Sequence, residues 1–312
     1  MRIFHGLEGL KQISKPVLTI GTFDGVHLGH QKILKNLNQV AEKIGGESVL
    51  FTFFPHPRMV LYPKSHGVRL IQTEDEKLKK LEEMGLQNII IIPFTVEFSR
   101  LSALEFVRDF LVNKIGVKQL VIGYDHQFGK NREGNIDYLR EVCETYDFGI
   151  TEISAKEMDE VNISSTKIRN ALKEGNIEVA NAYLGSKFEL FGTVTKGKGL
   201  GKTLGFPTAN ITPGSALKLI PGNGVYVVQA IIDGKKEFHG MLNIGTNPTI
   251  SDENNRTIEL HIIDFNDDIY GKEIEVQFLS RLRDEMKFES VPALIEQIKQ
   301  DEQVTRSYIL HQ

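Results

Sequence analysis

The pattern of apolar segments changes near residue 185, and this change limits most strongly what the chain can fold into. Before it, short apolar runs such as VLTIG (17–21) and NIIIIPF (88–94) alternate with stretches whose hydrophobic residues repeat at helical spacing. Strands separated by helices require right-handed crossovers and produce a mostly parallel sheet. The first part of the chain is therefore predicted to be an α/β, Rossmann-like domain.

After residue 185, strand-like runs follow one another without helices between them. They are residues 188–195, 224–232, 235–245, 257–265 and 272–279. This pattern predicts an antiparallel sheet or small β-barrel, closed by a C-terminal helix from about Val291 to Leu310. Since 312 residues exceed what one hydrophobic core usually serves, we expect two domains, residues 1–185 and 186–312.

Helix ends in the first domain carry local signals. Thr73 with Glu76, and Ser102 with Glu105, fit the capping box, in which each side chain satisfies an exposed backbone N–H of the other residue. The first helix is expected to stop at Gly45, since glycine readily adopts the left-handed conformation that ends helices. These signals predict helices that pack on the sheet.

Composition excludes several classes of protein. A net charge of −4 does not suit a dedicated nucleic-acid binder, which normally presents a basic surface. The single cysteine, Cys143, can form no internal disulfide, which fits a reducing compartment. The N-terminus lacks the pattern of a signal peptide, and no apolar run approaches the roughly 20 residues of a membrane span. We expect a soluble, cytoplasmic protein with no nucleic-acid or membrane partner.

GTFDGVHLGH, residues 21–30, places His27 and His30 where a buried strand gives way to a helix. Ligands bind at such turns, because the carboxyl ends of strands and the N-termini of helices converge there. Backbone N–H groups and the helix dipole favour phosphate, and imidazoles can stabilise charge during phosphoryl or nucleotidyl transfer. The alternative is a pair of solvated loop histidines.

Three further segments of the first domain have polar residues at strand or helix ends. Phe53–Pro57 (FFPHP) follows the next strand, and its prolines stiffen the segment around His56. Residues 123–129 (GYDHQFG) follow another strand. In residues 163–169 (ISSTKIR), serines precede a helical pattern, and lysine and arginine add positive charge that suits a triphosphate. Taken separately, these segments also fit a rigid strand exit and an ordinary capped surface helix.

The second domain contains a glycine-rich stretch, residues 197–210 (GKGLGKTLGFPTAN). Glycines permit close approach of the backbone to phosphates, and the lysines supply charge. It is not a Walker A loop, because the spacing and the strand-turn-helix context are wrong. Further on, TIELHI (257–262) alternates, so Glu259 and His261 share one face of a strand. A flexible hairpin and a glutamate on a wet strand face are the alternatives.

Together these motifs resemble the bacterial bifunctional riboflavin kinase/FMN adenylyltransferases, the prokaryotic FAD synthetases. Residues 21–30 resemble the H-x-G-H signature of the nucleotidyltransferase superfamily, and residues 163–169 resemble the family's I-S-S-T-x-I-R. The end of the glycine-rich stretch, P-T-A-N, resembles the riboflavin kinase signature. The matches run in order from about residue 21 to residue 288, so the resemblance covers nearly the whole chain.

The resemblance implies that the first domain adenylylates FMN. It makes His27, His30 and Arg169 catalytic. The residues expected to bind ATP are Gly21, Phe23, Asp24, Gly25, Ser164, Ser165, Thr166 and Lys167. Those expected to bind FMN are Phe54, Pro55, His56, Pro57, Asp125 and Phe128. His126 stands where the family has an aromatic residue, which departs from the pattern at a flavin-stacking position.

The resemblance implies that the second domain phosphorylates riboflavin, with Glu259 as general base on the 5′-hydroxyl. Thr208 and Asn210 would hold Mg²⁺ with ATP. The residues expected to bind ATP are Gly197, Lys198, Gly199, Gly201, Lys202, Pro207, Thr208 and Asn210. Those expected to bind riboflavin are Glu259, Arg283, Glu285 and Phe288. Lys202 replaces a frequent arginine, which keeps the charge but loses the fork of donors.

The implied partners are riboflavin, FMN and ATP, with flavins as substrates and products, and the chain is expected to be a monomer or weak oligomer. Two other functions remain open. One is a single-activity enzyme, either a kinase or an adenylyltransferase acting on another phosphate ester. The other is a flavin-binding regulatory or storage module without turnover, for which two complete phosphate-handling loops and Glu259 are unnecessary.

Overall fold

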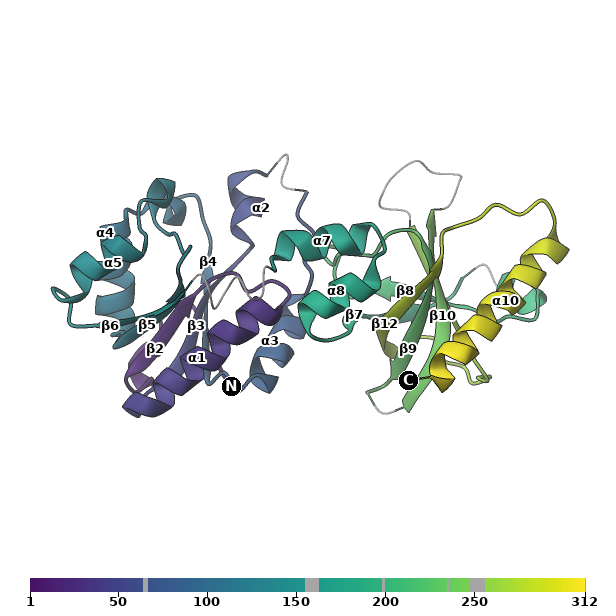
Figure 1. Ribbon diagram of the computed structural model, residues 1–312, viewed down its shortest axis with the longest axis horizontal. Helices are drawn as coiled ribbons and strands as arrows, with labels where there is room; N and C mark the ends of the chain where they lie inside the picture. Colours follow the sequence, from purple (N-terminus) through teal and green to yellow (C-terminus); the bar gives the residue numbers. More distant parts are fainter. Residues whose placement is uncertain (64–66, 155–162, 198–199, 235, 247–255, 312) are drawn as a thin grey trace. The chain divides into compact units, whose positions relative to one another are not determined.

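The computed structural model describes residues 1–63, 67–154, 163–197, 200–234, 236–246 and 256–311 (Figure 1). The chain forms two compact units. The first contains residues 1–69 and 74–164, and the second contains residues 70–73 and 165–312. The helical segment that follows residue 164 therefore belongs to the same unit as the C-terminal strands, whereas the boundary between activities at residue 185 stays a prediction.

A six-stranded sheet forms the centre of the first unit, with strand order β1-β4-β3-β2-β5-β6 and every neighbouring pair parallel. Its strands are β1 (Arg2–His5), β2 (Pro16–Ile20), β3 (Glu47–Phe54), β4 (Asn88–Pro93), β5 (Gln119–Gly123) and β6 (Gly149–Ile153). The predicted parallel α/β sheet is confirmed. The two edge strands, β1 and β6, were not predicted, because neither carries a continuous apolar run.

Helices cover both faces of this sheet (Figure 1). The helical elements of the first unit are η1 (Leu10–Gln12), α1 (Leu28–Ile44), α2 (Pro57–Leu61), α3 (Glu74–Glu83), η2 (Phe98–Arg100), α4 (Ala103–Glu105), η3 (Phe106–Ile115), η4 (Lys130–Arg132) and α5 (Ile136–Cys143). Leu37 of α1 and Leu81 of α3 pack with Leu50 on one face. Phe106 of η3 and Leu139 of α5 pack in a second core with Phe51 on the other. Successive residues of a strand thus serve opposite layers.

The predicted helix ends at Ser102 and at Gly45 are confirmed, whereas the Thr73–Glu76 capping box stays a prediction. Ser102 and Glu105 form a capping box with both hydrogen bonds present. Gly45 and Gly116 end their helices in the left-handed conformation, with φ of 62° and 70°. The helix that begins at Ala103 differs from expectation, since it continues as a π-helix from Phe106 to Ile115.

The second unit is built on a closed, antiparallel barrel with strand order β10-β11-β8-β7-β12-β9. Its elements are α7 (Ser165–Lys173), α8 (Ile177–Leu184), β7 (Phe188–Thr195), α9 (Leu200–Thr203), β8 (Ala209–Pro213), β9 (Gly224–Ile232), β10 (Lys236–Thr246), β11 (Arg256–Ile262), β12 (Glu273–Arg283) and α10 (Val291–Leu310). The predicted small barrel and C-terminal helix are confirmed. Within the described residues, no helix combines the length and the apolar character that crossing a membrane requires.

Two segments outside the barrel strands are tied to it by hydrogen bonds. On α8, the Asn181 amide donates to the Phe278 carbonyl (2.9 Å) and accepts from the Phe188 N–H (2.7 Å). Residues 70–73 also join this unit. The buried Lys218 ammonium donates to the Ile71 carbonyl (2.8 Å) and lies 4.6 Å from the Phe188 ring centre. These contacts explain why α8 and residues 70–73 fall in the barrel unit.

Candidate functional site

The first unit has a topological switch point between β2 and β5. From β2 the chain continues to β3 and β4 on one side, whereas β5 lies on the other side of β2. The helices that follow β2 and β5, α1 and α5, pack on opposite faces of the sheet. In open α/β sheets, the crevice at the carboxyl ends of such strands is where ligands bind. The topology thus locates a candidate site without reference to any motif.

Two sequence motifs begin side by side at this switch point, one at the end of β2 and one at the end of β5. Leu18 of β2 pairs with Leu120 of β5, so Gly21 and Gly123, each three residues further on, lie level at the carboxyl edge. Gly21 opens the 21–27 turn that leads into α1, and Gly123 opens GYDHQFG. The Gly21 N–H donates to the Phe51 carbonyl of β3 (3.1 Å), so the strand that leads into FPHP lies alongside.

The 21–27 turn has an unusual backbone. Phe23 and Val26 have positive φ angles of 49° and 35°. This region disfavours side chains, and a β-branched residue there is a genuine outlier that surrounding contacts must maintain. The Val26 N–H donates to the Phe23 carbonyl (3.3 Å), and the Gln31 amide donates to the Val26 carbonyl (2.9 Å). Strain of this kind accumulates at functional sites.

The turn aligns three rings in a stack. The His27 and His30 ring centres are 3.7 Å apart at 18°, and the Phe23 and His30 ring centres are 4.5 Å apart at 22°. His27 caps α1, with its Nδ1 accepting from the His30 backbone N–H (3.4 Å). Because Nδ1 accepts, the proton of a neutral His27 resides on Nε2, which is a donor.

The electrostatic surroundings keep His30 neutral. Burial lowers the pKa of His30 well below its usual range, and His27 and Lys77 lower it further. Its buried Nδ1 has no hydrogen-bond partner among the residues that the structure describes. A neutral imidazole at the N-terminus of α1, where the helix dipole and free N–H groups favour anions, can donate a hydrogen bond to a phosphate oxygen.

Sequence reasoning missed Lys77, in the first turn of α3. Its side chain is only 9% exposed, and that of Asp24 in the 21–27 turn is 4% exposed. Burial lowers the pKa of Lys77, whereas the charge of Asp24, followed by that of Glu74, raises it. A lysine within an acidic helix start carries no sequence signal that separates it from its solvated neighbours.

The FPHP segment lies at the carboxyl end of β3. Phe54 is 40% exposed, and a cis peptide bond joins it to Pro55. His56 caps α2 by accepting the Arg58 N–H at Nδ1 (3.2 Å), and Pro57 occupies the first turn of that helix. An exposed aromatic ring and a fixed imidazole thus stand at the edge of the sheet where the 21–27 turn begins.

In GYDHQFG, the structure buries Phe128, one of the two residues of this segment that were expected to bind FMN. Phe128 is 9% exposed and belongs to the core with Phe106. The His126 ring lies parallel to it at 6.1 Å and 26°, and burial lowers the pKa of His126 to about 4. Tyr124 and Asp125 are exposed at the end of β5. The FMN contacts of Asp125 and Phe128 stay predictions.

The ISSTKIR segment starts α7. Ile168 is buried against the rest of the second unit, whereas Thr166 and Lys167 are exposed. Ser164 is the last residue of the first unit, and Ser165, Thr166, Lys167 and Arg169 belong to the second. The alternation of buried and exposed residues confirms the helix, whereas its serine cap and the roles of its polar residues in phosphate binding stay predictions.

The barrel brings together a row of polar residues on neighbouring strands. Ile258 and Leu260 are buried, so Glu259 between them faces outward. Glu259 is paired with Asn210 of β8 on one side and with Asn243 of β10 on the other. Directly opposed residues of antiparallel strands place their side chains on one face, about 5 Å apart at Cβ. Sequence reasoning gave Asn243 no role, because only strand pairing reveals it.

The glycines before β8 lie against the proposed magnesium ligands. A Cβ at Gly197 would collide with the Asn210 side-chain amide, and a Cβ at Gly201 would lie 2.9 Å from the Thr208 hydroxyl. The glycines are therefore required for the loop to approach Thr208 and Asn210. Lys198 and Gly199 lie outside the described residues, as does the side chain of Lys202.

His261 fixes the other end of this loop. Its Nδ1 lies 2.9 Å from the Pro207 carbonyl, and its ring contacts Phe206 edge to face at 5.6 Å. Asn210 is held by its pairing with Thr195, whose hydroxyl donates to the Asn210 carbonyl (3.4 Å). The loop and the Glu259 row thus form a single site on the barrel.

Arg283, expected to contact riboflavin, is engaged with α10. Its guanidinium donates to both carboxylate oxygens of the buried Asp301 at 2.8 to 3.0 Å, and it lies 5.9 Å from the Phe288 ring centre. Glu285 accepts from the Asn223 amide (3.1 Å). A bidentate pair of this kind fixes geometry. The structure brings Arg283 and Phe288 together, and their flavin contacts stay predictions.

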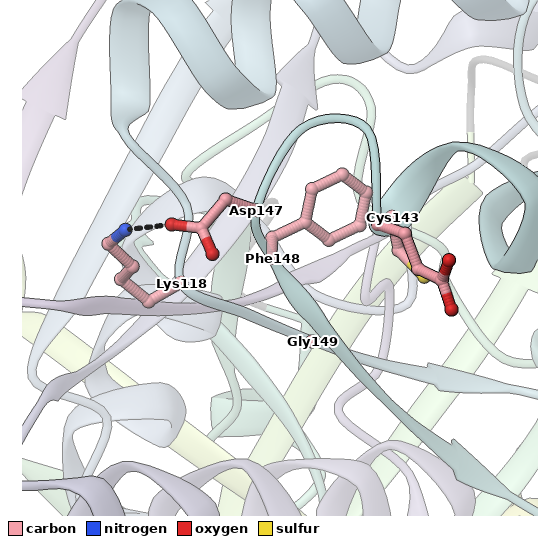
Figure 2. Close-up of a pocket in the computed structure, with 6 residues that line it drawn as sticks. Lys118, Cys143, Asp147, Phe148 and Gly149 are labelled. Carbon is pink, nitrogen blue, oxygen red and sulfur yellow. Dashed lines mark hydrogen bonds and ion pairs between the residues drawn. The ribbon is translucent and has the colours of Figure 1, made fainter.

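A cavity of about 330 Å³ lies at the opposite edge of the first sheet (Figure 2). Lys118 precedes β5, Gly149 begins β6, and Cys143 ends α5, so this cavity adjoins the amino ends of the strands. Figure 2 shows the Lys118 ammonium paired with the Asp147 carboxylate at 3.2 Å. The cavity is therefore separate from the switch point and is not the candidate active site.

Comparisons with known proteins match both units. A family model for FAD synthetase matches residues 10–167, and one for riboflavin kinase matches residues 184–309. A bifunctional riboflavin kinase/FMN adenylyltransferase from Buchnera aphidicola subsp. Schizaphis graminum is 39% identical, with 99% of each chain covered. The chain belongs to this family. The Escherichia coli (strain K12) protein of the same name is 36% identical and covers 99% of this chain and 98% of its own.

A solved structure from Streptococcus pneumoniae resembles the whole chain. Its TM-score is 0.88 at 32% identity, covering 98% of this chain and 99% of its own. It is described as a macrolide-efflux protein, whereas both family models and the curated relatives name flavin enzymes. The membership stated above rests on those models and relatives, and the solved structure supports the arrangement of elements within each unit.

Proposed function

We propose that residues 1–185 of this bifunctional enzyme carry the FMN adenylyltransferase activity and that residues 186–312 carry the riboflavin kinase activity. The main support for the first assignment is the His27–His30 stack, with His30 held neutral, at the topological switch point beside the N-terminus of α1. The ranges matched by the two family models, 10–167 and 184–309, divide the chain in the same way.

In the adenylyltransferase, the FMN phosphate attacks the α-phosphorus of ATP and pyrophosphate leaves. His27 and His30 donate hydrogen bonds to the phosphate oxygens on which charge develops. Ser164, Ser165, Thr166 and Arg169 hold the β- and γ-phosphates, and the exposed ring of Phe54 with His56 receives the flavin. Positioning and charge stabilisation suffice, so no covalent enzyme intermediate is required.

In the kinase, Glu259 orients the riboflavin 5′-hydroxyl and accepts its proton as oxygen attacks the γ-phosphorus of ATP and ADP leaves. Asn210 and Asn243, which flank Glu259, orient its carboxylate or the hydroxyl. A carboxylate suits this step because phosphoryl transfer demands mainly positioning and acceptance of one proton. The glycine-rich loop around Gly197 and Gly201 lies over the ATP phosphates.

Magnesium fits the donors at Thr208 and Asn210. A hydroxyl and an amide oxygen are hard ligands of the kind that Mg²⁺ accepts, usually beside several waters and substrate phosphates. The described residues contain no group of three or more His, Cys, Asp or Glu side chains that could form a metal cage, so the ion would come with ATP. When bound, it neutralises charge on the transferring phosphates.

The proposed setting is the cytoplasm, with riboflavin, FMN and ATP as the only partners and the chain as a monomer or weak oligomer. The net charge of −4 and the single cysteine support this setting. Light scattering after size-exclusion chromatography, with and without flavin, measures the oligomeric state. A stable dimer or larger assembly would contradict the proposal.

One assay tests the chemical assignment. The protein is incubated with riboflavin and Mg-ATP, and the flavins are separated over time. We expect FMN to appear first and FAD to follow, and supplied FMN to give FAD with release of pyrophosphate. FMN alone would remove the adenylyltransferase assignment, FAD from supplied FMN alone would remove the kinase assignment, and absence of both products would leave only a flavin-binding module.

A further inference from the structure

Lys77 is a buried cation that the proposed chemistry leaves without a role. Its side chain is 9% exposed, which is unusual for lysine, because burial of an unpaired charge is costly. It lies in the first turn of α3, and Leu81 of the same helix packs in the core with Phe23 and Val26 of the 21–27 turn. α3 is therefore fixed against that turn.

An opposite charge lies in the turn itself. Burial lowers the pKa of Lys77, and the charge of Asp24, followed by that of Glu74, opposes this shift. Asp24 is 4% exposed, so it is directed into the protein. Two opposite charges that are buried together between α3 and the turn partly offset each other's desolvation free energy, whereas either charge buried alone would not be compensated.

The turn needs such an anchor. Phe23 and Val26, on either side of the Asp24–Gly25 pair, both have positive φ. Phe23 in that conformation stacks its ring on His30 at 4.5 Å. Lys77 is thus coupled electrostatically to Asp24, whose neighbour Phe23 packs with Leu81 of α3 and stacks on His30.

Lys77 also acts on the charge of His30. The groups that shift the pKa of His30 are His27, on the adjoining turn, and Lys77, on α3, both of which lower it in addition to burial. Glu74, the exposed Asp75 and the buried Glu76 are the other charged groups of the α3 first turn. Removal of the ammonium should therefore let the His30 pKa rise toward its ordinary value of about 6.5.

We propose that Lys77 is a positioning residue for FMN adenylylation, which acts through Asp24 to hold the 21–27 turn and the Phe23–His30 stack. The inference rests on the proposed function of the first unit and adds a residue outside its motifs. Asp24 is assigned by resemblance to ATP binding, which stays a prediction, and in this proposal it also holds the turn. Lys77 touches neither FMN nor ATP.

The central test compares Lys77→Met with Lys77→Arg in FAD formation from supplied FMN. We expect kcat to fall about 10- to 100-fold in Lys77→Met, as loss of alignment does, with both KM values within about threefold. Lys77→Arg keeps the charge and should recover most of kcat. Riboflavin phosphorylation by the same samples should be unchanged, which reports that the chain is folded.

Histidine titration by NMR gives a readout that a purely structural role would not move. In labelled wild-type protein, His30 should stay neutral well below pH 6.5, and in Lys77→Met its pKa should rise. Lys77→Met removes a positive charge that acts on the buried Asp24 carboxylate, so Lys77→Met/Asp24→Asn is made beside it. If the two residues act together, kcat of the double variant is no lower than that of the worse single variant.

Three results would overturn the inference. The first is a higher KM for ATP at unchanged kcat in Lys77→Met, which would mean that Lys77 contacts the nucleotide. The second is a double variant whose kcat loss equals the product of the two single losses. The third is a His30 pKa that is the same in Lys77→Met as in the wild-type protein. Failure of the wild-type protein to make FAD from FMN would instead remove the proposed function of the first unit, so the two failures are distinguishable.

Discussion

The two candidate sites are built by different means. The first-unit site is assembled from loops at one edge of a parallel sheet, where a strained turn stacks Phe23, His30 and His27. The barrel site is assembled within the sheet itself, where strand register places Glu259 between Asn210 and Asn243. The geometry of a site built on loops depends on the residues that pack under those loops. The geometry of a site built on paired strands depends on the strand register, which a closed barrel fixes.

This difference predicts that substitutions should separate the two activities cleanly. Side chains of the 21–27 turn should affect FAD formation alone, and side chains of the β8–β11–β10 row should affect FMN formation alone. Each experiment below measures both activities in the same sample, so that the unaffected one reports on folding.

The largest effect is expected from Glu259→Ala. Loss of the general base should lower the rate of riboflavin phosphorylation by about 100- to 10,000-fold. Adenylylation of supplied FMN should stay within about twofold of wild type. The flavin products are quantified in two separate reactions, one started from riboflavin and one started from FMN. Kinase turnover that survives the substitution would remove Glu259 from its role.

His30→Ala should do the reverse. Removal of one preorganised donor to the transferring phosphate should lower FAD formation by about 100- to 1,000-fold, with FMN formation unchanged. Single-turnover measurements with supplied FMN separate this loss from slower product release. Equal loss of both activities would contradict a division into two sites.

Gly197→Ala tests whether the loop must approach the barrel row. The added Cβ would collide with the Asn210 amide and displace it. We expect about a tenfold or greater loss of riboflavin phosphorylation, since misplacement of about 1 Å can cost that much. Gly205→Ala is the matched control, because nothing lies within 4 Å of its added Cβ, although its φ of 87° adds strain. Equal kinase rates in Gly197→Ala and Gly205→Ala would contradict the proposal that the glycine-rich loop must lie close to Asn210.

The smallest effect concerns stability and pH. The pKa of His126 is about 4 in the folded protein and about 6.5 when unfolded, so between these values the unfolded chain binds a proton that the folded chain does not. The free energy of unfolding should therefore fall as pH drops from about 6.5 to about 4, by up to about 3 kcal/mol from this residue.

His126→Phe removes that contribution and restores the aromatic residue typical of the family. Urea unfolding followed by circular dichroism at several pH values should show a shallower decline for the variant. The same experiment on His261→Phe provides a comparison in the barrel unit. If the free energy of unfolding falls with pH by the same amount in the wild-type protein and in His126→Phe, burial of a neutral His126 does not contribute to the pH dependence of stability.

Much of the fold could be predicted because its signals are local. Ser102 with Glu105, and Gly45 at the end of α1, act on backbone groups within a few residues. The alternation around Glu259 similarly identified its outward face. The edge strands β1 and β6 escaped prediction, because each pairs with a strand on one side only and needs no continuous apolar run.

The features of the candidate sites also divide into those set by local sequence, which could be predicted, and those set by long-range packing, which could not. The residue types in GTFDGVHLGH and in the glycine-rich stretch 197–210 were enough to predict phosphate binding, because each places its donors within a short segment. The roles of FPHP and P-T-A-N came from the family resemblance and stay predictions. Burial of Phe128 in the core and the pairing of Arg283 with Asp301 could not be read from sequence. Both depend on packing against segments that are distant along the chain.

The sequence by itself determined the two kinds of unit, the ends of the main helices and the donors available for phosphate. Only the tertiary structure decided that Lys77 and Asp24 are both buried and act on each other electrostatically, that Asn243 flanks Glu259, and that α7 and α8 belong with the barrel. Local periodicity and capping fix elements, because they involve neighbouring residues. Which elements meet, and which charges are buried between them, depends on the packing free energy of the whole unit.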